Sequence, residues 1–462
     1  MSAFRVGADG SLIELPGSPF TTGGHGCDGG FYASNRITVS PRGNFLYASN
    51  TDSNDVSAFS IDLSSGNLTA VPGSPFPLNS PGSMCSVFTF VMGISLAATP
   101  DGRFLMAGSP WSETITAFRI GADGSLTAVP GSPFFAGGTP IGLKVSPNGK
   151  FLAAGLLGSV AMFGIAPDGS LTLVPGSPFS DSGVGRAAGV DVNCKSDLLF
   201  AGEANNGNTI VDVFRIGPTG ALTPIAGSPF VAGVGDNSNV PLLSPDDRLL
   251  FVSNQNRPSV TVFSVTPDGT LALVPGSPFA VGGGYSARGM ATNPSGTLLF
   301  TANDIDLVGV LTVASDGILT PTPGPPLSTG EPYSYLTSLA AFPSKACGIA
   351  VDIDIKPGSF PNAVNSRSKG VTPVAILSEP GFDAPTEIDT ASLTFGRTGD
   401  EPSLAFCRSS AEDVNGDGLL DVVCHFDTRA TGFLLGDAQG VLNGKTLSGV
   451  PIRGTDYVRF VK

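Results

Sequence analysis

The residues best suited to chemistry in this sequence form a short run near its C-terminus, Asp413-Val414-Asn415-Gly416-Asp417-Gly418-Leu419-Leu420-Asp421. Side-chain oxygens recur at its first, third, fifth and ninth positions, and a glycine occupies the sixth, where a calcium loop bends sharply. The main-chain carbonyl of Leu419 adds a ligand at the seventh position. We therefore expect Asp413, Asn415, Asp417, Leu419 and Asp421 to bind calcium. The alternative is a surface Asx-turn without an ion.

The residues after this run indicate how such an ion would act. An EF-hand has a bidentate glutamate at position 12, which here is Cys424, and it continues into a helix. Residues 422–426 instead read as a strand. We therefore expect a structural ion, with an affinity suited to extracellular calcium of about 10⁻³ M. Asp352 and Asp354 share one strand face, and they form either a second site or a solvated surface.

A second group of candidate residues lies near strands that recur through the first 350 residues. Arg36, Arg186 and Arg288 come just before or at the start of such strands, and a guanidinium fork suits a carboxylate or a lactone oxygen. Glu203 is the acid that we group with them as a ligand-binding candidate. Alternatively, each arginine bonds loop carbonyls or a neighbouring acid. The sequence assigns no catalytic residue.

An internal repeat supplies the elements that position these residues. Pro-Gly-Ser-Pro-Phe recurs with its last residue at Phe20, Phe76, Phe134, Phe179, Phe230 and Phe279, and a degraded copy follows at Pro323–Leu327. Copies lie about 50 residues apart, a spacing typical of propeller blades. In the motif, we expect the Pro and Gly to set a turn at the outer strand and the Phe to pack between blades.

A second motif, a Ser-Pro-x-Gly-like turn between two strands, alternates with the first. It occurs at residues 40–43, 99–102, 146–149, 244–247 and 293–296, with weaker copies around Cys194 and Pro343. Each period thus holds four short strands, which make one blade. The chain begins in mid-blade, and strands at 335–351 would complete that blade. We predict an all-β fold with a seven-bladed β-propeller closed by N-terminal strands.

The repeats resemble the lactonase-like propellers, which include 6-phosphogluconolactonase, and the related YVTN-type surface-layer repeats. The likeness covers roughly residues 1–350 and rests on segments such as residues 39–50, Val-Ser-Pro-Arg-Gly-Asn-Phe-Leu-Tyr-Ala-Ser-Asn. It implies a histidine beside Arg and Glu where inner strands start, placed to move a proton during ring opening or closure. Residues 139–142, 237–240 and 286–289 contain no histidine. His25, near Asp28 in a Gly-rich loop, is the only histidine in the repeats.

From Val351 the repeat stops, and residues 351–462 form a second predicted domain after residues 1–350. It resembles a C-terminal β-sandwich module of many secreted bacterial proteins, through residues 354–359, 373–377 and 413–418. Cys407 and Cys424 in this domain, and Cys27 and Cys85 in long loops of neighbouring repeats, are two candidate disulfides. We expect Cys194 and Cys347 to be free thiols.

Charge and hydropathy exclude other classes of function. The net charge of −14 leaves no clustered basic face for nucleic acid. The most apolar stretch, residues 87–98, is shorter than the about 20 residues that a spanning helix needs. The printed chain shows no secretion signal at its start, so the start of the mature protein stays open.

Together these features predict an extracellular binding or scaffold propeller with a calcium-stabilised C-terminal module. Its partner would be a small molecule, a polysaccharide or a protein, bound on one propeller face. The alternative is a lactonase-like hydrolase that acts on a cyclic ester in the propeller channel, using Arg36, Arg186 or Arg288 and an acid such as Glu203.

Overall fold

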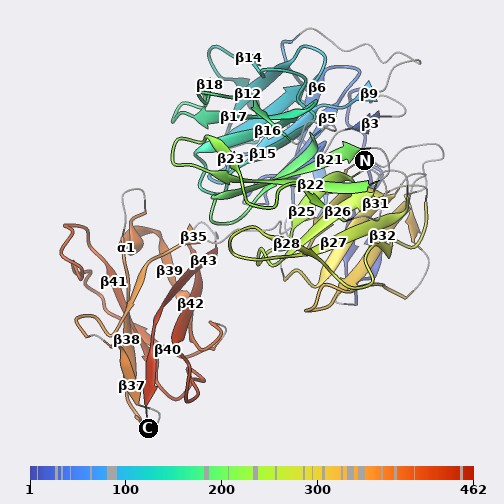
Figure 1. Ribbon diagram of the computed structural model, residues 1–462. Coiled ribbons are helices and arrows are strands. Elements are labelled where there is room, and N and C mark those ends of the chain that lie inside the picture. Colours follow the sequence, from blue (N-terminus) through green and yellow to red (C-terminus); the bar gives the residue numbers. More distant parts are fainter. Residues whose placement is uncertain are drawn as a thin grey trace. The chain divides into compact units, whose positions relative to one another are not determined.

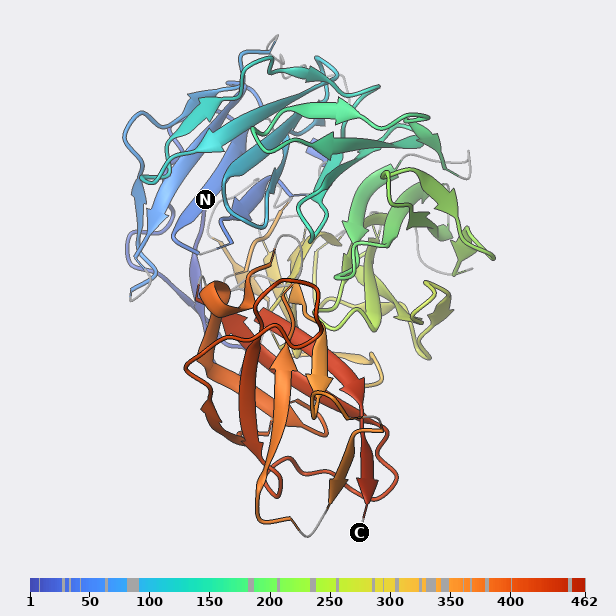
Figure 2. The same cartoon turned by 90° about the vertical axis from the view of Figure 1, so that its left-hand side faces the viewer.

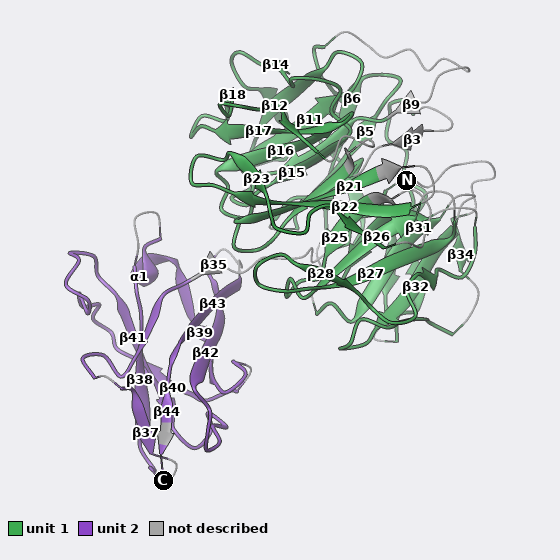
Figure 3. Ribbon diagram, viewed as in Figure 1, with its two compact units in different colours: residues 1–345 green, residues 346–462 purple. Residues whose placement is uncertain are grey.

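A computed structural model gives the fold of the chain. It describes all residues except 8, 27–29, 33–34, 42, 63–64, 81–90, 182–186, 206–207, 233–237, 255–256, 285–286, 294, 304–306, 324–325, 330–337, 342–348, 360, 366–367, 379–381, 400, 448–450 and 462. The chain divides into two compact units, Met1–Lys345 and Ala346–Lys462 (Figure 3). No helix of the described residues is long and apolar enough to cross a membrane.

The first unit contains six antiparallel sheets of one design. In each, four strands follow chain order, and a short fifth strand pairs with the third. The first sheet comprises β4 (Ile37–Val39), β5 (Phe45–Asn50), β6 (Asp55–Ile61), β7 (Leu68–Ala70) and β8 (Phe76–Pro77). The second comprises β10 (Ser95–Ala98), β11 (Phe104–Ser109), β12 (Thr114–Ile120), β13 (Leu126–Ala128) and β14 (Phe134–Phe135). The third comprises β15 (Gly142–Val145), β16 (Phe151–Leu156), β17 (Ser159–Ile165), β18 (Leu171–Leu173) and β19 (Phe179–Ser180).

The remaining three sheets repeat the same order of strands. The fourth comprises β20 (Ala187–Val192), β21 (Leu198–Asn205), β22 (Asn208–Ile216), β23 (Leu222–Pro224) and β24 (Phe230–Val231). The fifth comprises β25 (Ser238–Leu243), β26 (Leu249–Asn254), β27 (Ser259–Val265), β28 (Leu271–Leu273) and β29 (Phe279–Ala280). The sixth comprises β30 (Ala287–Thr292), β31 (Leu298–Asn303), β32 (Leu307–Val313), β33 (Leu319–Pro321) and β34 (Leu327–Ser328).

The sheets follow one another around a common axis in chain order, as the blue-to-yellow sequence of colours in Figures 1 and 2 shows. The first strands of consecutive sheets contact each other, so they lie innermost. Each sheet packs its two faces against its neighbours. The core between the second and third sheets, for example, contains Phe104, Met106, Leu143, Leu152 and Phe163. The middle strands are therefore apolar on both faces, unlike those of a sheet with one solvated side.

Glycines in the turns between third and fourth strands pack closely against the preceding sheet. A methyl group placed on Gly124, in the β12–β13 turn, would lie 2.4 Å from the Phe45 ring of the preceding sheet. Gly124 has a φ of 84°, so the position needs glycine both for its backbone and for this close approach. The corresponding pairs are Gly169 with Phe104, Gly220 with Phe151, Gly269 with Leu198, and Gly317 with Leu249.

The N-terminal hairpin, β1 (Phe4–Val6) with β2 (Leu12–Glu14), occupies the remaining place in the ring. Its turn residue Gly10 approaches Leu298 of the sixth sheet, and its Leu15 approaches Gly66 of the first sheet. Arg5 also donates a hydrogen bond to the Ser65 carbonyl at 2.8 Å. The hairpin therefore lies between the last and first full sheets, as predicted for a propeller closed by N-terminal strands. The strands expected at 335–351 fall almost entirely outside the described residues.

The repeated Pro-Gly-Ser-Pro-Phe motif ties each fifth strand to its own sheet. Its Ser-Pro bond is cis in six copies. The serine hydroxyl accepts the main-chain N–H of the third strand, as Ser132 does from Ala117 at 2.9 Å. The motif glycine has a positive φ, 86° at Gly131, and it lies under its own Phe134 ring. The motif is therefore architectural, as expected, and the serine adds a role that its spacing did not predict.

The second unit is a β-sandwich. One sheet has the order β35 (Ile349–Ala350), β43 (Pro451–Tyr457), β42 (Gln439–Thr446) and β39 (Ile388–Gly396). The other has β36 (Ile353–Ile355), β38 (Val371–Ile376), β41 (Val422–Asp427) and β40 (Leu404–Cys407). Both contribute to one core, including Phe395 and Phe426, whose ring centroids lie 5.0 Å apart. The short helix α1 (Ala384–Glu387) precedes β39, and β37 (Ala363–Asn365) pairs with β44 (Arg459–Val461).

The cysteines confirm one prediction and overturn another. Cys407 and Cys424 face each other across β40 and β41 and form the predicted disulfide. Cys194 is also disulfide-bonded, so the expectation of a free thiol there was wrong. That expectation used only its turn position, which says nothing about a partner distant in sequence. Cys27, Cys85 and Cys347 lie outside the described residues.

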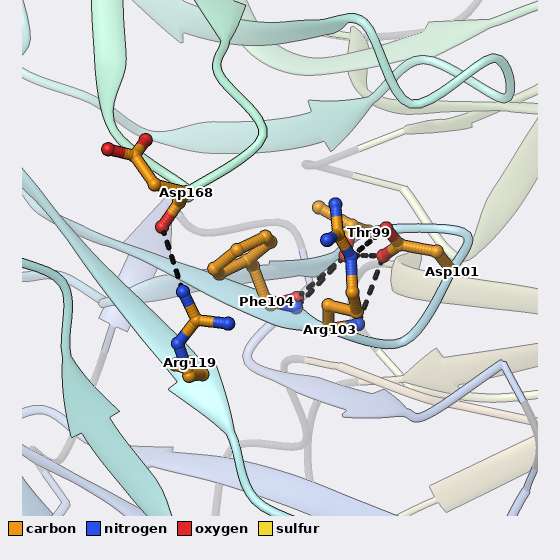
Figure 4. A network of polar contacts seen from close by, with 6 residues as sticks. All are labelled: Thr99, Asp101, Arg103, Phe104, Arg119 and Asp168. Carbon is orange, nitrogen blue, oxygen red and sulfur yellow. Dashed lines mark hydrogen bonds and ion pairs between the residues drawn. The ribbon is translucent and has the colours of Figure 1, made fainter.

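Cation–π stacking reinforces one of the interlocking contacts. The guanidinium groups of Arg103 and Arg119 lie 5.2 and 5.0 Å from the centroid of the Phe104 ring and flank it (Figure 4). Arg103 is held by an ion pair with Asp101 at 2.6 Å. Arg119 donates to the main-chain carbonyl of Asp168 at 3.5 Å in the next sheet. These groups are half-exposed, so we expect them to contribute about 0.5–1 kcal/mol per stacked pair.

Candidate functional site

The candidate site lies where the innermost strands begin, an end of the first unit that we call the upper end. Arg36 precedes β4, and its carbonyl accepts the Ser49 N–H at 2.9 Å. Just before it, β3 (Gly30–Tyr32) pairs in parallel with β9 (Val91–Met92), and the Asn35 carbonyl accepts the Leu96 N–H at 2.8 Å. The first and second sheets are thus joined main chain to main chain beside Arg36.

Arg36 has a guanidinium whose hydrogen-bonding capacity is only partly used. Its Nε and Nη2 atoms are buried and have no hydrogen-bond partner. The guanidinium lies on Gly93, since a methyl group on that glycine would be 2.2 Å from Nε and 2.5 Å from Nη2. A buried donor without an acceptor costs about 1–3 kcal/mol, and more when it is charged. The site therefore favours a ligand that brings acceptor oxygens.

Arg288 lies close enough to Arg36 to act on it electrostatically. Burial, and then the positive charge of Arg288, lower the pKa of Arg36 to about 10. Arg288 itself is buried on β30, and its carbonyl accepts the hydroxyl of Ser253 at 3.0 Å. Arg36 therefore still carries its charge at neutral pH. Two neighbouring buried cations attract an anion, and the structure thus brings together two of the three predicted arginines.

Polar ties between first strands fix the frame around these arginines. Asn35, with a φ of 61°, donates from its side chain to the Leu143 carbonyl of β15 at 3.2 Å. Lys144 and Asp191 hold the same position on consecutive first strands and form an ion pair at 2.7 Å. The other carboxylate oxygen of Asp191 accepts the Leu243 N–H at 2.8 Å. These contacts therefore link the first strands of the third, fourth and fifth sheets to one another, and they link the residue before β4 to the third sheet.

Glu203 is placed differently from the arginines. It lies near the end of β21 and is 1% exposed. Burial, and then the charges of Asp181 and Asp212, raise its pKa to about 9. Glu203 is therefore protonated at neutral pH, and the groups that set its pKa are acids rather than Arg36 or Arg288. Sequence reasoning missed Asp181 and Asp212, although both replace residues that are neutral at the corresponding positions of the other sheets.

The asparagines Asn50 and Asn254, which end second strands, have structural roles. Asn50 donates to Asp55 at 2.6 Å and to Ser57 at 2.7 Å, rather than to the main chain of a turn. Asn254 likewise bonds Ser259 and Thr261. These contacts join the ends of the second and third strands. We therefore find no ligand-binding role for Asn50 or Asn254.

The other candidates of the propeller contribute less to a site. Arg186 and Asp28 lie outside the described residues. His25 is exposed, and its described contacts are made by its main chain: its carbonyl accepts the Asp52 N–H at 3.0 Å. His25 therefore shows none of the buried, strand-start placement that the family resemblance implies for a proton-transferring histidine. Gly93, which supports Arg36, was missed because a single glycine carries no signal in one sequence.

The predicted calcium run forms an exposed, tightly curled loop before β41. The Asp413 carboxylate accepts N–H groups of Gly416, Asp417 and Gly418 at 2.7–3.2 Å. The side-chain amide of Asn415 donates a hydrogen bond to the Asp417 carboxylate at 3.0 Å. The φ values of Gly416 and Gly418, 79° and 89°, need glycine. The side-chain oxygens of Asp413, Asn415 and Asp417 thus lie in one turn.

Asp421 has a different position from the other predicted ligands. Its side chain is buried, and its two oxygens accept the N–H groups of Ser378 and Val414, both at 2.8 Å. Asp421 therefore anchors the loop to the segment after β38. No group of three or more His, Cys, Asp or Glu side chains among the described residues is placed to hold a metal ion. The donor set that fits calcium is Asp413, Asn415, Asp417 and the Leu419 carbonyl, an all-oxygen set suited to a hard cation.

Comparisons with known proteins define the fold. No family model and no curated protein sequence matches the chain. A "putative 6-phosphogluconolactonase" of Bacteroides uniformis superposes with a TM-score of 0.55 at 20% identity, covering 72% of this chain and 93% of its own. One of Bacteroides fragilis gives 0.54 at 22% identity, covering 72% and 92%. The periplasmic gluconolactonase of Pseudomonas aeruginosa gives 0.53 at 21% identity, covering 73% and 93%.

These likenesses cover the first unit and establish its architecture. The chain shares the β-propeller fold of these three structures, as its repeats predicted. At such low identity the similarity shows the fold alone, so the activity has to be argued from the site.

Proposed function

We propose that the propeller is a lactonase-like hydrolase that opens a cyclic ester, with Arg36 and Arg288 binding the acyl end. The observation that carries this proposal is the Arg36 guanidinium, whose Nε and Nη2 atoms are buried without a partner, beside the buried Arg288. The names of similarly folded proteins support this reading over the binding or scaffold role expected first.

Ring opening needs little more than a positioned oxyanion site and water. Water adds to the lactone carbonyl, and the bond between the acyl carbon and the ring oxygen breaks. One proton of the water passes to the ring oxygen, and the other is released to solvent as the new carboxyl group ionises. The carbonyl oxygen becomes negative in the transition state, and the product ends in a carboxylate. Buried guanidinium groups stabilise both species, because fixed donors in a site of low dielectric act strongly on developing charge. Glu203 is given no part in this step.

A lactone screen tests the proposal. We expect the purified chain to accelerate the opening of sugar-acid lactones, with and without a phosphate, followed by acid release in a pH-stat. Arg36→Met and Arg288→Met should each reduce the rate about 10²-fold, as when one oxyanion donor is removed. Gly164→Ala is the matched control, because a methyl group there meets only one atom, at 3.9 Å. No acceleration of any lactone would retire the enzyme in favour of a ligand-binding propeller.

For the second unit, we propose a structural calcium ion bound by Asp413, Asn415, Asp417 and the Leu419 carbonyl. Three side-chain oxygens in one exposed turn support it, together with the glycines that shape that turn. The ion would offset repulsion between Asp413 and Asp417 and stiffen the chain that enters β41.

We also propose that the protein works outside the cytoplasm. The disulfide between Cys407 and Cys424 and the disulfide-bonded Cys194 support this, since such bonds persist in oxidising compartments. Calcium near its extracellular concentration would keep the loop occupied there. Fractionation of the producing cells, with the disulfides assayed by thiol labelling, tests the location. Recovery of the reduced protein in the cytoplasm would contradict it.

A further inference from the structure

The two unpartnered donors of Arg36 define how a ligand would approach, if the proposed function holds. Nε and Nη2 share one edge of the planar guanidinium, the edge that forms two parallel hydrogen bonds with a pair of oxygens. Both are buried and lack a partner. A single acceptor, such as one hydroxyl, would leave the second donor unsatisfied. The edge therefore suits a group with two oxygens on one atom, a carboxylate or a phosphate.

Gly93 is the residue on which the Arg36 guanidinium rests. A methyl group at Gly93 would lie 2.2 Å from Nε, 2.4 Å from Cζ and 2.5 Å from Nη2. These separations are shorter than real carbon contacts, so any side chain at this position would push the guanidinium away. Gly93 follows β9, and the parallel pairing of β3 with β9 brings it beside Arg36. The φ of Gly93 is not positive, so the backbone does not require glycine here.

We propose that Gly93 is a positioning residue for Arg36, and that its missing side chain keeps the Nε–Nη2 edge aimed at a two-oxygen anion. Gly93 touches no ligand in this account and acts only through Arg36. The atoms that an added methyl group would displace are the far end of a flexible side chain, not main chain. Gly93→Ala should therefore fold and lose anion binding, whereas a main-chain clash would unfold the sheet.

Two other glycines serve as references. At Gly289 an added methyl group would lie 2.6 Å from the Ser338 Cα, a main-chain clash. At Gly164 it would meet only the Thr172 carbonyl oxygen, at 3.9 Å. Gly289→Ala should therefore disturb folding, and Gly164→Ala should behave as the parent. Gly93→Ala is expected to match Gly164→Ala in thermal unfolding and to differ from it in binding.

The test is a calorimetric titration with two probes, sodium gluconate for a carboxylate and inorganic phosphate for a phosphate. The parent and Gly164→Ala should bind at least one probe, and Gly93→Ala should bind it at least 10-fold more weakly. Arg36→Met should lose the same binding, and Gly93→Ala/Arg36→Met should be no weaker than Arg36→Met alone, since both changes remove one interaction. Which probe binds distinguishes a carboxylate from a phosphate site.

A probe-independent readout separates this inference from the proposed function. The Arg36 Nε–H resonance, assigned by its loss in Arg36→Met, should shift in Gly93→Ala and stay in place in Gly164→Ala. If this resonance shifts in Gly93→Ala but the parent binds neither probe, the proposed anion site is wrong and the positioning role of Gly93 still holds. The role of Gly93 would be overturned if the Arg36 Nε–H resonance does not move in Gly93→Ala, or if Gly93→Ala binds the probe as tightly as the parent. It would also be overturned if the losses of binding in the two single variants add up in Gly93→Ala/Arg36→Met.

Discussion

Glu203 holds in the fourth sheet the position that Asn50 holds in the first. Each is the sixth residue of its second strand, counted from Leu198 and Phe45. Asp212 pairs with the fourth residue of its second strand as Ser57 does, so an acid also replaces the hydroxyl that Asn50 bonds. A protonated carboxyl group has a donor and an acceptor, as an amide does. At this position Glu203 can therefore donate a hydrogen bond, as asparagine does, only while it keeps its proton.

This relationship predicts how the stability of the protein depends on pH. The pKa of Glu203 is about 9 in the fold, against 4.5 for an ordinary glutamate. Between these values the folded state binds more protons than the unfolded state, so stability falls as pH rises through this window. Glu203→Gln removes the titration. It should match the parent near pH 4 and exceed it increasingly above pH 5, by up to about 1.4 kcal/mol per pH unit. Urea unfolding of both proteins at several pH values measures this, and a constant difference would contradict it.

Arg36 should make the protein more stable when an anion is present. The lowered pKa of Arg36 means that its charge destabilises the folded state below about pH 10. Oxygens of a bound anion would offset this destabilisation. Gluconate or phosphate should raise the melting temperature of the parent above that in sodium chloride of equal ionic strength. Arg36→Met should show no such rise. The rise should fade as the pH passes about 10, and equal rises in both proteins would speak against this site.

Calcium removal should affect the second unit alone. With a chelator in place of calcium, the melting transition of that unit should fall by several degrees, because the ion binds the folded loop better than the unfolded chain. In Asp417→Ala, the melting temperature of the second unit should be at the lower value whether calcium is present or not. Asp168→Ala is the control, since it removes another exposed turn aspartate, one that bonds Ser170 in the first unit. If the chelator does not change the melting curves, the loop is a surface turn that binds no ion.

The interlock between the second and third sheets should be sensitive to one glycine. Gly169 has a φ of 90°, and a methyl group there would lie 2.3 Å from the Phe104 ring, which Arg103 and Arg119 flank. Gly169→Ala should cost about 1–3 kcal/mol, from backbone strain and overpacking together. Denaturant unfolding compared with Gly164→Ala gives the value. A difference below about 0.5 kcal/mol, the range of neutral surface changes, would show that the interlock adds little.

Much of the fold could be predicted because it repeats. The sequence of a single blade is a weak signal for its strands and turns, but the Pro-Gly-Ser-Pro-Phe motif repeats that signal several times. The start of the chain in mid-blade followed from counting the strands. The contact of Gly10 with Leu298 and of Leu15 with Gly66 agrees with that count. The disulfide of Cys407 with Cys424 was predictable because both cysteines lie in one small domain.

The site was less accessible to prediction, because its residues meet only through the ring. Arg36 and Arg288 could be proposed from their places before strands, yet neither the absence of partners on Arg36 nor its rest on Gly93 is visible in sequence. Glu203 looked like a partner of the arginines until its surroundings proved acidic. Asp421 was predicted as a fourth side-chain ligand, and its contacts with the Ser378 and Val414 N–H groups could not be predicted from its spacing. Such assignments depend on the direction of a side chain, which spacing along one chain does not fix.

The most direct measurement is the initial rate of gluconolactone opening in a pH-stat near pH 6, corrected for the spontaneous reaction, for the parent and for Arg36→Met. We predict a clear acceleration by the parent and a loss of about 10²-fold in Arg36→Met, with Gly164→Ala unchanged. A parent no faster than the spontaneous reaction, or an Arg36→Met variant as fast as the parent, would contradict it.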